Sequence, residues 1–324
     1  MKGGSAMPGA VCRRRSLTAL FLVAALGLGG CVFRPSAEPL SDGPLKIGFV
    51  NGGSTQFHTC LQRAVEKTAR NNFAEIYTAD SRQDAERELS NIQDMIERQV
   101  DVIIVQTVST QALKQDIAKA KKADIPIFLT SVTADPSDIL GAVVVDLKAV
   151  GKLDAEWIWK DADGRSAEVG VIAGAPGAAS DVLVGSFIGA LPSNAQVVAN
   201  QPGMFDAEKA RQVAASMIQE HPDLDYVFIA NEQMAFAARK SFDAAGATDV
   251  KIVTVNGTDE GLAALKDGRF AATVSNSAAD TGKLAVENAI AMMRGEEVDK
   301  VDNTPILLTT KDNADRAPLY CIQG

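Results

Sequence analysis

The chain from residue 45 onward alternates short apolar runs with longer stretches in which apolar residues recur every three or four positions. The short runs predict strands at residues 45–50, 75–79, 101–105, 125–129 and 142–145. The longer stretches predict helices between them, at residues 57–71, 81–99 and 109–122. The run at 101–105 reads Asp-Val-Ile-Ile-Val, which favours a strand buried on both faces. Strands that alternate with helices in this way predict βαβ units and a parallel sheet.

The same pattern restarts after residue 146. It predicts strands at 168–173, 196–199, 226–230, 251–255 and 271–275, and helices at 147–160, 179–190, 206–220, 232–245, 259–267 and 278–294. We therefore expect an α/β protein with two doubly wound parallel-sheet lobes joined by a multi-strand hinge. The N-terminal lobe would comprise residues 45–146 and 277–304, and the C-terminal lobe residues 147–276 and 305–324. The chain would then cross between lobes near residues 146, 276 and 304.

The first residues have the pattern of an export signal. Three arginines at 13–15 precede an apolar run at 17–28, which is shorter than the ~20 residues of a transmembrane helix. Residues 1–30 are therefore predicted to be a signal peptide. Leu-Gly-Gly-Cys at 28–31 resembles the lipobox of bacterial lipoproteins, which implies cleavage before Cys31 and a lipid on that residue. The alternative is an ordinary signal that contains a cysteine.

Composition adds a tether and excludes one class of partner. Residues 31–44 hold three prolines and no apolar periodicity, as expected of a link between a lipidated Cys31 and the folded body. The protein is therefore expected outside the cytoplasm, periplasmic or otherwise extracytoplasmic, and anchored to a membrane by lipid. A net charge of −9 argues against a nucleic-acid partner, whose binding surface would need clustered lysine and arginine.

Two of the four cysteines are disulfide candidates. Cys12 would leave with the signal and Cys31 would carry lipid, so Cys60 and Cys321 remain. In an oxidising compartment such a pair can form a disulfide. Two buried thiols are the alternative.

Motifs of catalysis and metal binding are missing from the sequence. The two histidines, His58 and His221, belong to no HxxxH motif, and neither CxxC nor a dense carboxylate cluster occurs. The glycines at 170, 174 and 177 do not match G-x-G-x-x-G and indicate a tight turn after a strand. We predict no enzyme activity, no cofactor and no metal.

The loops that follow the predicted strands are rich in neutral hydrogen-bonding side chains. In open parallel sheets, ligands bind beyond the carboxyl ends of the strands. Amides and hydroxyls both donate and accept, which suits ligand hydroxyls, and aromatic faces suit the C–H side of a sugar ring. Turn chemistry is the alternative explanation for asparagine at a strand end. The side chains concerned are Ser54, Thr55, Gln56, Phe57, Gln106, Thr130, Ser131, Phe205, Asn231, Asn256 and Asn276.

Residues 46–312 resemble the type I periplasmic binding proteins of sugar ABC transporters, the ribose- and galactose-binding group. The resemblance is carried by 101–105, Ala-Asp-Ile-Pro-Ile at 123–127, Gly-Met-Phe-Asp at 203–206, His-Pro-Asp-Leu-Asp-Tyr-Val-Phe-Ile-Ala-Asn-Glu at 221–232, Gly-Thr-Asp at 257–259 and Asp-Gly-Arg-Phe-Ala-Ala-Thr-Val at 267–274. It implies a monomer that closes two lobes around a sugar, polyol or amino sugar and delivers it to an ABC permease. A ligand-sensing lipoprotein that signals through a membrane receptor is equally compatible with the sequence.

The resemblance also implies positions for the site. The family's first loop, with its polar and aromatic contacts, matches Ser54, Thr55, Phe57 and His58, and its polar residue after the third strand matches Gln106. Its aromatic residue before an aspartate matches Phe205, and its three later strand-end positions match Asn231, Asn256 and Asn276.

Two departures from the family pattern concern the ligand. Sugar binders often carry Asp-Arg where this chain has Thr130-Ser131, and an arginine where it has Asp181. Arginine donates in a fixed fork, whereas an aspartate only accepts, so a common aldose held in the usual manner is not expected. Asp181 would accept from ligand hydroxyls or pair with an ammonium. Its alternative role is to stabilise the start of its helix.

Overall fold

The computed structural model describes residues 43–323. The predicted signal peptide, Cys12, Cys31 and nearly all of the predicted tether lie outside this range. Within it, no helix is both long enough and apolar enough to cross a membrane.

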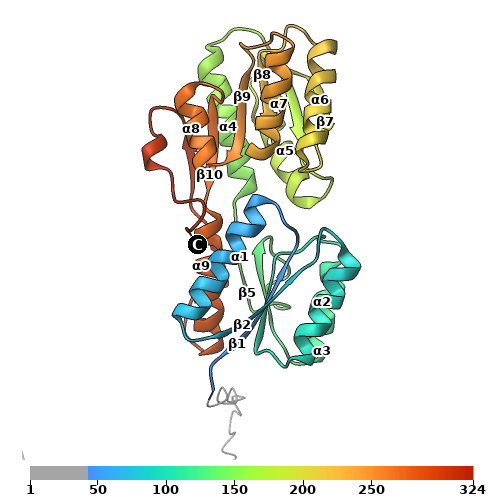
Figure 1. The fold of residues 1–324 in the computed structure, drawn as a ribbon, viewed down its shortest axis with the longest axis vertical. Helices are drawn as coiled ribbons and strands as arrows, with labels where there is room; N and C mark the ends of the chain where they lie inside the picture. The colour runs from blue at the N-terminus through green and yellow to red at the C-terminus, as the bar shows by residue number, and fades with distance from the viewer. Residues whose placement is uncertain (1–42, 324) are drawn as a thin grey trace, which may run out of the picture. The chain divides into compact units, whose positions relative to one another are not determined.

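The first sheet has the strand order β2-β1-β3-β4-β5-β11, and every neighbouring pair is parallel. Helices α1 and α9 cover one face of this sheet, and α2 and α3 cover the other (Figure 1). The strands are β1 (Lys46–Asn51), β2 (Glu75–Asp80), β3 (Val102–Val105), β4 (Ile127–Ser131), β5 (Gly141–Val144) and β11 (Val301–Asn303). The helices are α1 (Gln56–Asn71), α2 (Ala85–Glu97), α3 (Leu113–Lys122) and α9 (Ala278–Met293).

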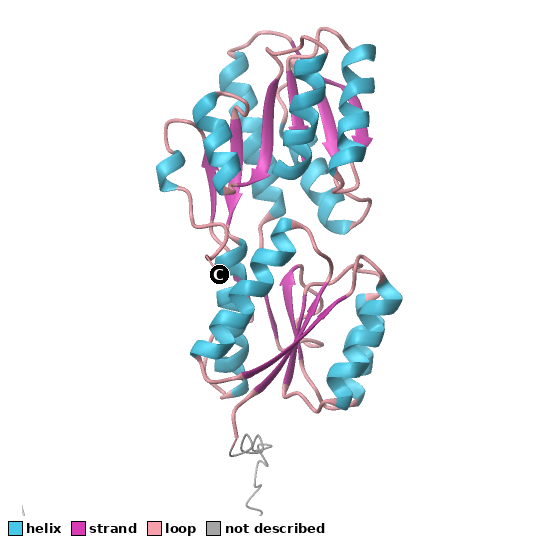
Figure 2. Cartoon of the chain, viewed as in Figure 1, coloured by secondary structure: helices cyan, strands magenta, loops and turns pink. Residues whose placement is uncertain are grey.

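The second sheet repeats this order as β7-β6-β8-β9-β10-β12. Figure 2 shows its strands in magenta among the cyan helices. Its last strand, β12, runs antiparallel to β10. Helix α4 packs with α5, and α6 packs with α7. The strands are β6 (Ala167–Ala173), β7 (Ala195–Pro202), β8 (Tyr226–Ile229), β9 (Lys251–Asn256), β10 (Ala272–Asn276) and β12 (Ile306–Thr309). The helices are α4 (Leu147–Ala162), α5 (Ala178–Ala190), α6 (Ala207–Glu220), α7 (Glu232–Ala244), α8 (Asp259–Asp267) and the 3-10 helix η1 (Ala314–Arg316).

The two sheets confirm the predicted α/β fold of two doubly wound lobes, with β12 as the antiparallel exception. Buried β-branched strands carry both cores, because parallel strands are covered by helices on both faces. The chain passes between the sheets after β5, after β10 and after β11. After the second passage, α9 places Ala285, Val286 and Ala289 in the core of the first lobe.

One helix begins later than the sequence predicted. The expected start at Ser81 is displaced to Ala85, because Asp84 caps the helix by accepting from the Arg87 N–H at 2.7 Å. Arg82 and Gln83 have φ of +51° and +62°, so they form a turn between β2 and α2. This turn directs Gln83 toward the candidate site.

The C-terminal tail returns to the first lobe. Cys321 forms a disulfide with Cys60 of α1, with the two Cα atoms 4.9 Å apart. Of the two states left open by the sequence, the structure has the disulfide.

Candidate ligand-binding site

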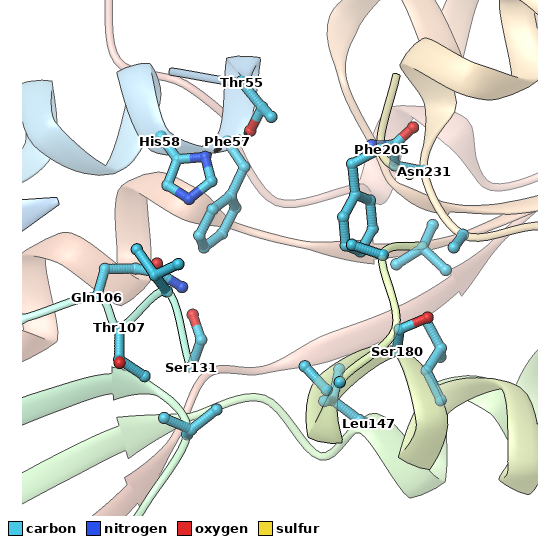
Figure 3. A pocket seen from close by; sticks show the side chains of 18 of the residues that line it. Thr55, Phe57, His58, Gln106, Thr107, Ser131, Leu147, Ser180, Phe205 and Asn231 are labelled. Carbon is cyan, nitrogen blue, oxygen red and sulfur yellow. Dashed lines mark hydrogen bonds between the residues drawn. The ribbon is translucent and has the colours of Figure 1, made fainter. Parts of the chain in front are cut away.

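The carboxyl ends of strands from both sheets line one cavity of about 640 Å³. Figure 3 shows Thr55, Phe57, His58 and Gln106 along one side and Phe205 and Asn231 along the other. The lining includes these predicted residues: Thr55, Phe57, His58, Gln106, Ser131, Asp181, Phe205, Asn231, Asn256 and Asn276. The cavity therefore lies beyond the carboxyl ends of the strands, where ligands bind in open parallel sheets.

Two predicted residues do not belong to the lining. Ser54 is exposed on the loop after β1 and lies outside the cavity wall. Thr130 is fully buried within β4, where its hydroxyl donates to the Val105 carbonyl at 3.4 Å. Successive residues of a strand face opposite sides of its sheet, so only Ser131 of the Thr130-Ser131 pair reaches the cavity.

His58 is held as a neutral hydrogen-bonding group. Its Nδ1 shares a 2.7 Å hydrogen bond with the Thr55 hydroxyl, and its carbonyl accepts from the Asn51 side chain at 3.0 Å. Burial lowers the pKa of His58 to about 4, against the opposing effects of the Gln106 side chain and the Asp80 charge. The imidazole therefore offers one donor and one acceptor at neutral pH.

Gly52 permits a close approach between the ends of β1 and β3. A Cβ atom at this position would lie 2.7 Å from the Gln106 carbonyl oxygen, which is backbone and cannot move aside. A glycine is therefore required for Gln106 to lie over the end of β1.

A buried carboxylate fixes the loop after β3. Glu88 of α2 accepts from the Thr107 hydroxyl and from the Val108 N–H, each at 2.6 Å, and both residues line the cavity. Asp116 of α3 is buried beside it, and burial and the neighbouring Glu88 charge raise the pKa of Asp116 to about 7. Protonated Asp116 can therefore bond Glu88, and no other group in the described chain bonds its carboxyl oxygens.

Phe205 enters from the second lobe on a strained turn. Met204 and Phe205 have φ of +60° and +55°, which bulky residues rarely adopt. The turn lays the Phe205 ring over Gly174, where any side chain would collide with the ring. Gly174 and the turn thus place an aromatic face in the cavity wall.

Three asparagines stand at the ends of β8, β9 and β10. Asn231 accepts from the Met234 N–H at 2.9 Å and caps α7. Asn276 is 8% exposed, and its side-chain oxygen has no hydrogen-bond partner among residues 43–323. The buried hydroxyl of Ser131 is unpaired in the same part of the chain. Both oxygens are buried away from solvent, although their residues line the cavity.

A second buried carboxylate fixes the loop after β9. Glu232 accepts from the Gly257 N–H at 2.8 Å, from the Thr258 N–H at 2.9 Å and hydroxyl at 2.5 Å, and from the Thr273 hydroxyl at 2.8 Å. Burial raises its pKa, although these donors act in the opposite direction. Glu232 is therefore the counterpart in the second lobe of Glu88 in the first.

The cavity wall carries little charge. Among residues 43–323, the cavity wall contains no lysine or arginine, and its one carboxylate is that of Asp181. Asp181 lies exposed in the first turn of α5, whose N-cap residue is Gly177. In residues 43–323, no three His, Cys, Asp or Glu side chains are grouped to hold a metal ion. This wall can bind by neutral hydrogen bonds and aromatic contact.

Several lining residues were not singled out by the sequence. Gln83 follows β2, so the rule of looking after each strand would have found it had the segment not been assigned to a helix. Tyr320 had no such signal, because it lies on the tail beyond the last strand. The other lining residues outside the predicted strand-end loops are Thr110, Gln111, Leu147, Leu183, Ala230, Gln233 and Val255.

Two α/β lobes that present neutral polar loops to one cavity define a receptor for a small polar molecule. The chain belongs to the periplasmic binding protein family, because the family model described as periplasmic binding protein domain matches residues 47–297.

Relatives and solved structures agree with this membership. The ribose import binding protein of Bacillus subtilis is 27% identical over 305 residues, which cover 92% of this chain and 99% of that protein. The xylitol-binding protein of Mycolicibacterium smegmatis is 25% identical over 304 residues, covering 92% and 86%. An ABC transporter solute-binding protein from Mycobacterium smegmatis with bound glycerol is 27% identical, covers 87% and 100%, and has a TM-score of 0.81.

Proposed function

We propose that this protein captures a neutral sugar or polyol between its lobes and delivers it to the permease of an ABC transporter. The observation that carries the proposal is the cavity wall, which combines neutral donors and acceptors with the aromatic side chains of Phe57, Phe205 and Tyr320 and has no lysine or arginine. Relatives named for ribose import and xylitol binding support the ligand class.

The site supports binding without catalysis. The lining holds one hydroxyl beside an imidazole, Thr55 with His58, and no carboxylate of the described chain is hydrogen-bonded to His58 to orient it as a base. In this proposal the protein is not an enzyme, acts as an exported monomer and is anchored through lipid on Cys31. Labelling with a fatty-acid probe, lost in a Cys31→Ala protein, tests the anchor.

The ligand class is tested by a thermal-shift panel. The neutral compounds are D-ribose, xylitol, myo-inositol and glycerol, and the matched anions are ribose 5-phosphate and D-ribonate. A ligand that binds only the folded state raises the melting temperature, so we expect a shift with at least one neutral compound and none with the anions. Stabilisation by the anions alone, or by no compound, would contradict the proposal.

Asp181 decides whether an amino sugar is preferred. A carboxylate at the cavity wall can pair with a ligand ammonium, or accept from hydroxyls of a neutral polyol, which is our first choice. Titration of D-glucosamine and D-glucose on the wild type, on Asp181→Asn and on the control Asp259→Asn separates these two roles. Asp259 is a matched control because it is an exposed residue in the first turn of α8, outside the cavity wall. An amine preference that only Asp181→Asn abolishes assigns the ammonium to Asp181; no preference assigns Asp181 to neutral hydroxyls or to its helix.

A further inference from the structure

The last residues connect the two lobes outside the three chain passages. The tail leaves the second lobe at η1, which is tied to α8 by a 2.7 Å ion pair between Asp315 and Lys266. It then reaches the beginning of α9, where the Ser277 hydroxyl donates to the Leu319 carbonyl at 2.6 Å. Cys321 ends this path with its disulfide to α1. A covalent bond therefore holds the tail of the second lobe against the first.

Tyr320 occupies the middle of this path and lines the cavity. Its carbonyl accepts from the Ala279 N–H at 3.1 Å, and its side chain is only 3% exposed. The ring packs with Cys60 and Ala278, and Phe57, itself a cavity residue, packs against the same cluster. Tyr320 is thus a buried wall residue that the tail supplies.

The hydroxyl of Tyr320 has no hydrogen-bond partner in the described part of the chain, since no side chain or backbone group of residues 43–323 bonds it. Burial, and to a smaller extent the charge of Glu232, raise the pKa of Tyr320, so the phenol stays protonated. A neutral phenol can donate to one ligand oxygen and accept from one ligand hydroxyl.

The disulfide is the strongest anchor of this segment. Residues 317–323 contain no helix or strand, so their order depends on side-chain contacts and a few hydrogen bonds. The hydrogen bonds to Leu319 and Tyr320 are individually weak against the conformational entropy of a free chain end. Without the bond to Cys60, the tail would have little to hold it in the cavity wall.

We propose that Tyr320 is a ligand-facing, specificity-determining residue that the Cys60–Cys321 disulfide holds in the cavity wall, so that loss of the bond lowers affinity. The part that concerns affinity rests on the proposed function, because it needs a ligand in the cavity. The part that concerns position does not.

The position is tested without a ligand. Amide hydrogen exchange is compared between the wild type and a Cys60→Ser/Cys321→Ser protein, in the tail and at Ala279, whose N–H bonds the Tyr320 carbonyl. We expect faster exchange at both places in the variant and unchanged exchange in β8 and β9, which lie in the core of the second lobe. Equal exchange in the tail would overturn the positioning role of the disulfide.

The contact is tested by titration with D-ribose, xylitol, myo-inositol and glycerol. Tyr320→Phe removes only the hydroxyl and keeps the buried ring, so the variant is expected to fold and to lose roughly tenfold in affinity for the best-bound compound. Tyr320→Ala and the double serine variant should each lose at least as much. The matched control is Tyr77→Phe, since Tyr77 lies on β2 outside the wall and its hydroxyl bonds only Glu75.

The outcomes separate the two proposals. Wild-type affinity in both Tyr320→Phe and Tyr320→Ala would overturn the ligand-facing role and leave the proposed function intact. A wild type that binds none of the four compounds contradicts the proposed function, and the exchange measurement still decides whether the disulfide holds Tyr320 in place.

Discussion

Phe57 and Phe205 bring aromatic faces into the cavity from different lobes. If they enclose the apolar side of a sugar or polyol, Phe57→Ala and Phe205→Ala should each weaken binding by roughly 1–3 kcal/mol. Isothermal titration with the best-bound panel compound measures the loss. Phe73→Ala is the control, because Phe73 is 87% exposed and lies outside the cavity wall. Unchanged affinity in both variants would remove these residues from the site.

His58 and Asp116 give stability opposite dependences on pH. Burial lowers the pKa of His58 from 6.5 to about 4, so its contribution is present above pH 6.5 and is lost as the pH falls through about 4. Burial and Glu88 raise the pKa of Asp116 from 3.8 to about 7, so its contribution is present below pH 3.8 and is lost as the pH rises through about 7. Between about pH 4 and pH 6.5, a rise in pH increases the stability that comes from His58 and decreases the stability that comes from Asp116.

Single substitutions should expose each dependence. Asp116→Asn should make the free energy of unfolding rise more steeply than in the wild type from pH 4 to 6.5, and His58→Gln should make it fall from pH 4 to 7. Each slope is limited to about 1.4 kcal/mol per pH unit, the value for one proton. Urea unfolding across this range measures both slopes, and variants whose slopes match the wild type would contradict the assignment.

At the scale of elements, a buried carboxylate from the helix after one strand holds the loop after the next strand of the chain, as Glu88 and Glu232 both do. Glu232→Gln replaces one accepting carboxylate oxygen by an amide NH₂ group, which cannot accept hydrogen bonds. Donors that now bond Glu232 would lose their acceptor, so the substitution should cost about 2–4 kcal/mol of folding free energy. Urea unfolding gives the cost, and hydrogen exchange should be faster at Gly257 and Thr258. Glu260→Gln, exposed in the first turn of α8, is the control. A variant as stable as that control would show that Glu232 does not hold the loop.

The alternation of strands and helices sufficed to predict both lobes, because the central strands, such as β3 and β8, are continuous apolar runs and the helices between strands carry polar residues on one face. The rule that ligands bind beyond the carboxyl ends of parallel strands also predicted most of the cavity wall. That rule could not show that the Thr130 side chain lies outside the wall, because a shift of one residue along a strand moves a side chain to the opposite face of the sheet. Strands β11 and β12 are too short to give a clear periodicity. Tyr320 depends on a contact between residues 261 positions apart in the chain, which no local pattern reveals.

At the scale of the whole molecule, the disulfide should contribute strongly to stability. The bond closes a loop with a sequence separation of 261 residues, for which the chain-entropy treatment gives an upper figure of roughly 5 kcal/mol. Cys60→Ser/Cys321→Ser should therefore lower the melting temperature by on the order of 10 °C. Calorimetry of the oxidised wild type and the variant checks this, and equal melting temperatures would refute it.

The three passages of the chain between the lobes have a consequence for biosynthesis. The core of the first lobe needs Ala285, Val286 and Ile290 of α9, and its sheet needs β11. A ribosome that has finished β5 has made five of the six strands of this lobe, yet of the two helices on one face of their sheet only α1 is present. The first lobe therefore cannot complete its core and sheet until nearly the whole chain, including the second lobe up to β10, has been made. The lobe that begins first in the sequence is thus completed only near the end of synthesis.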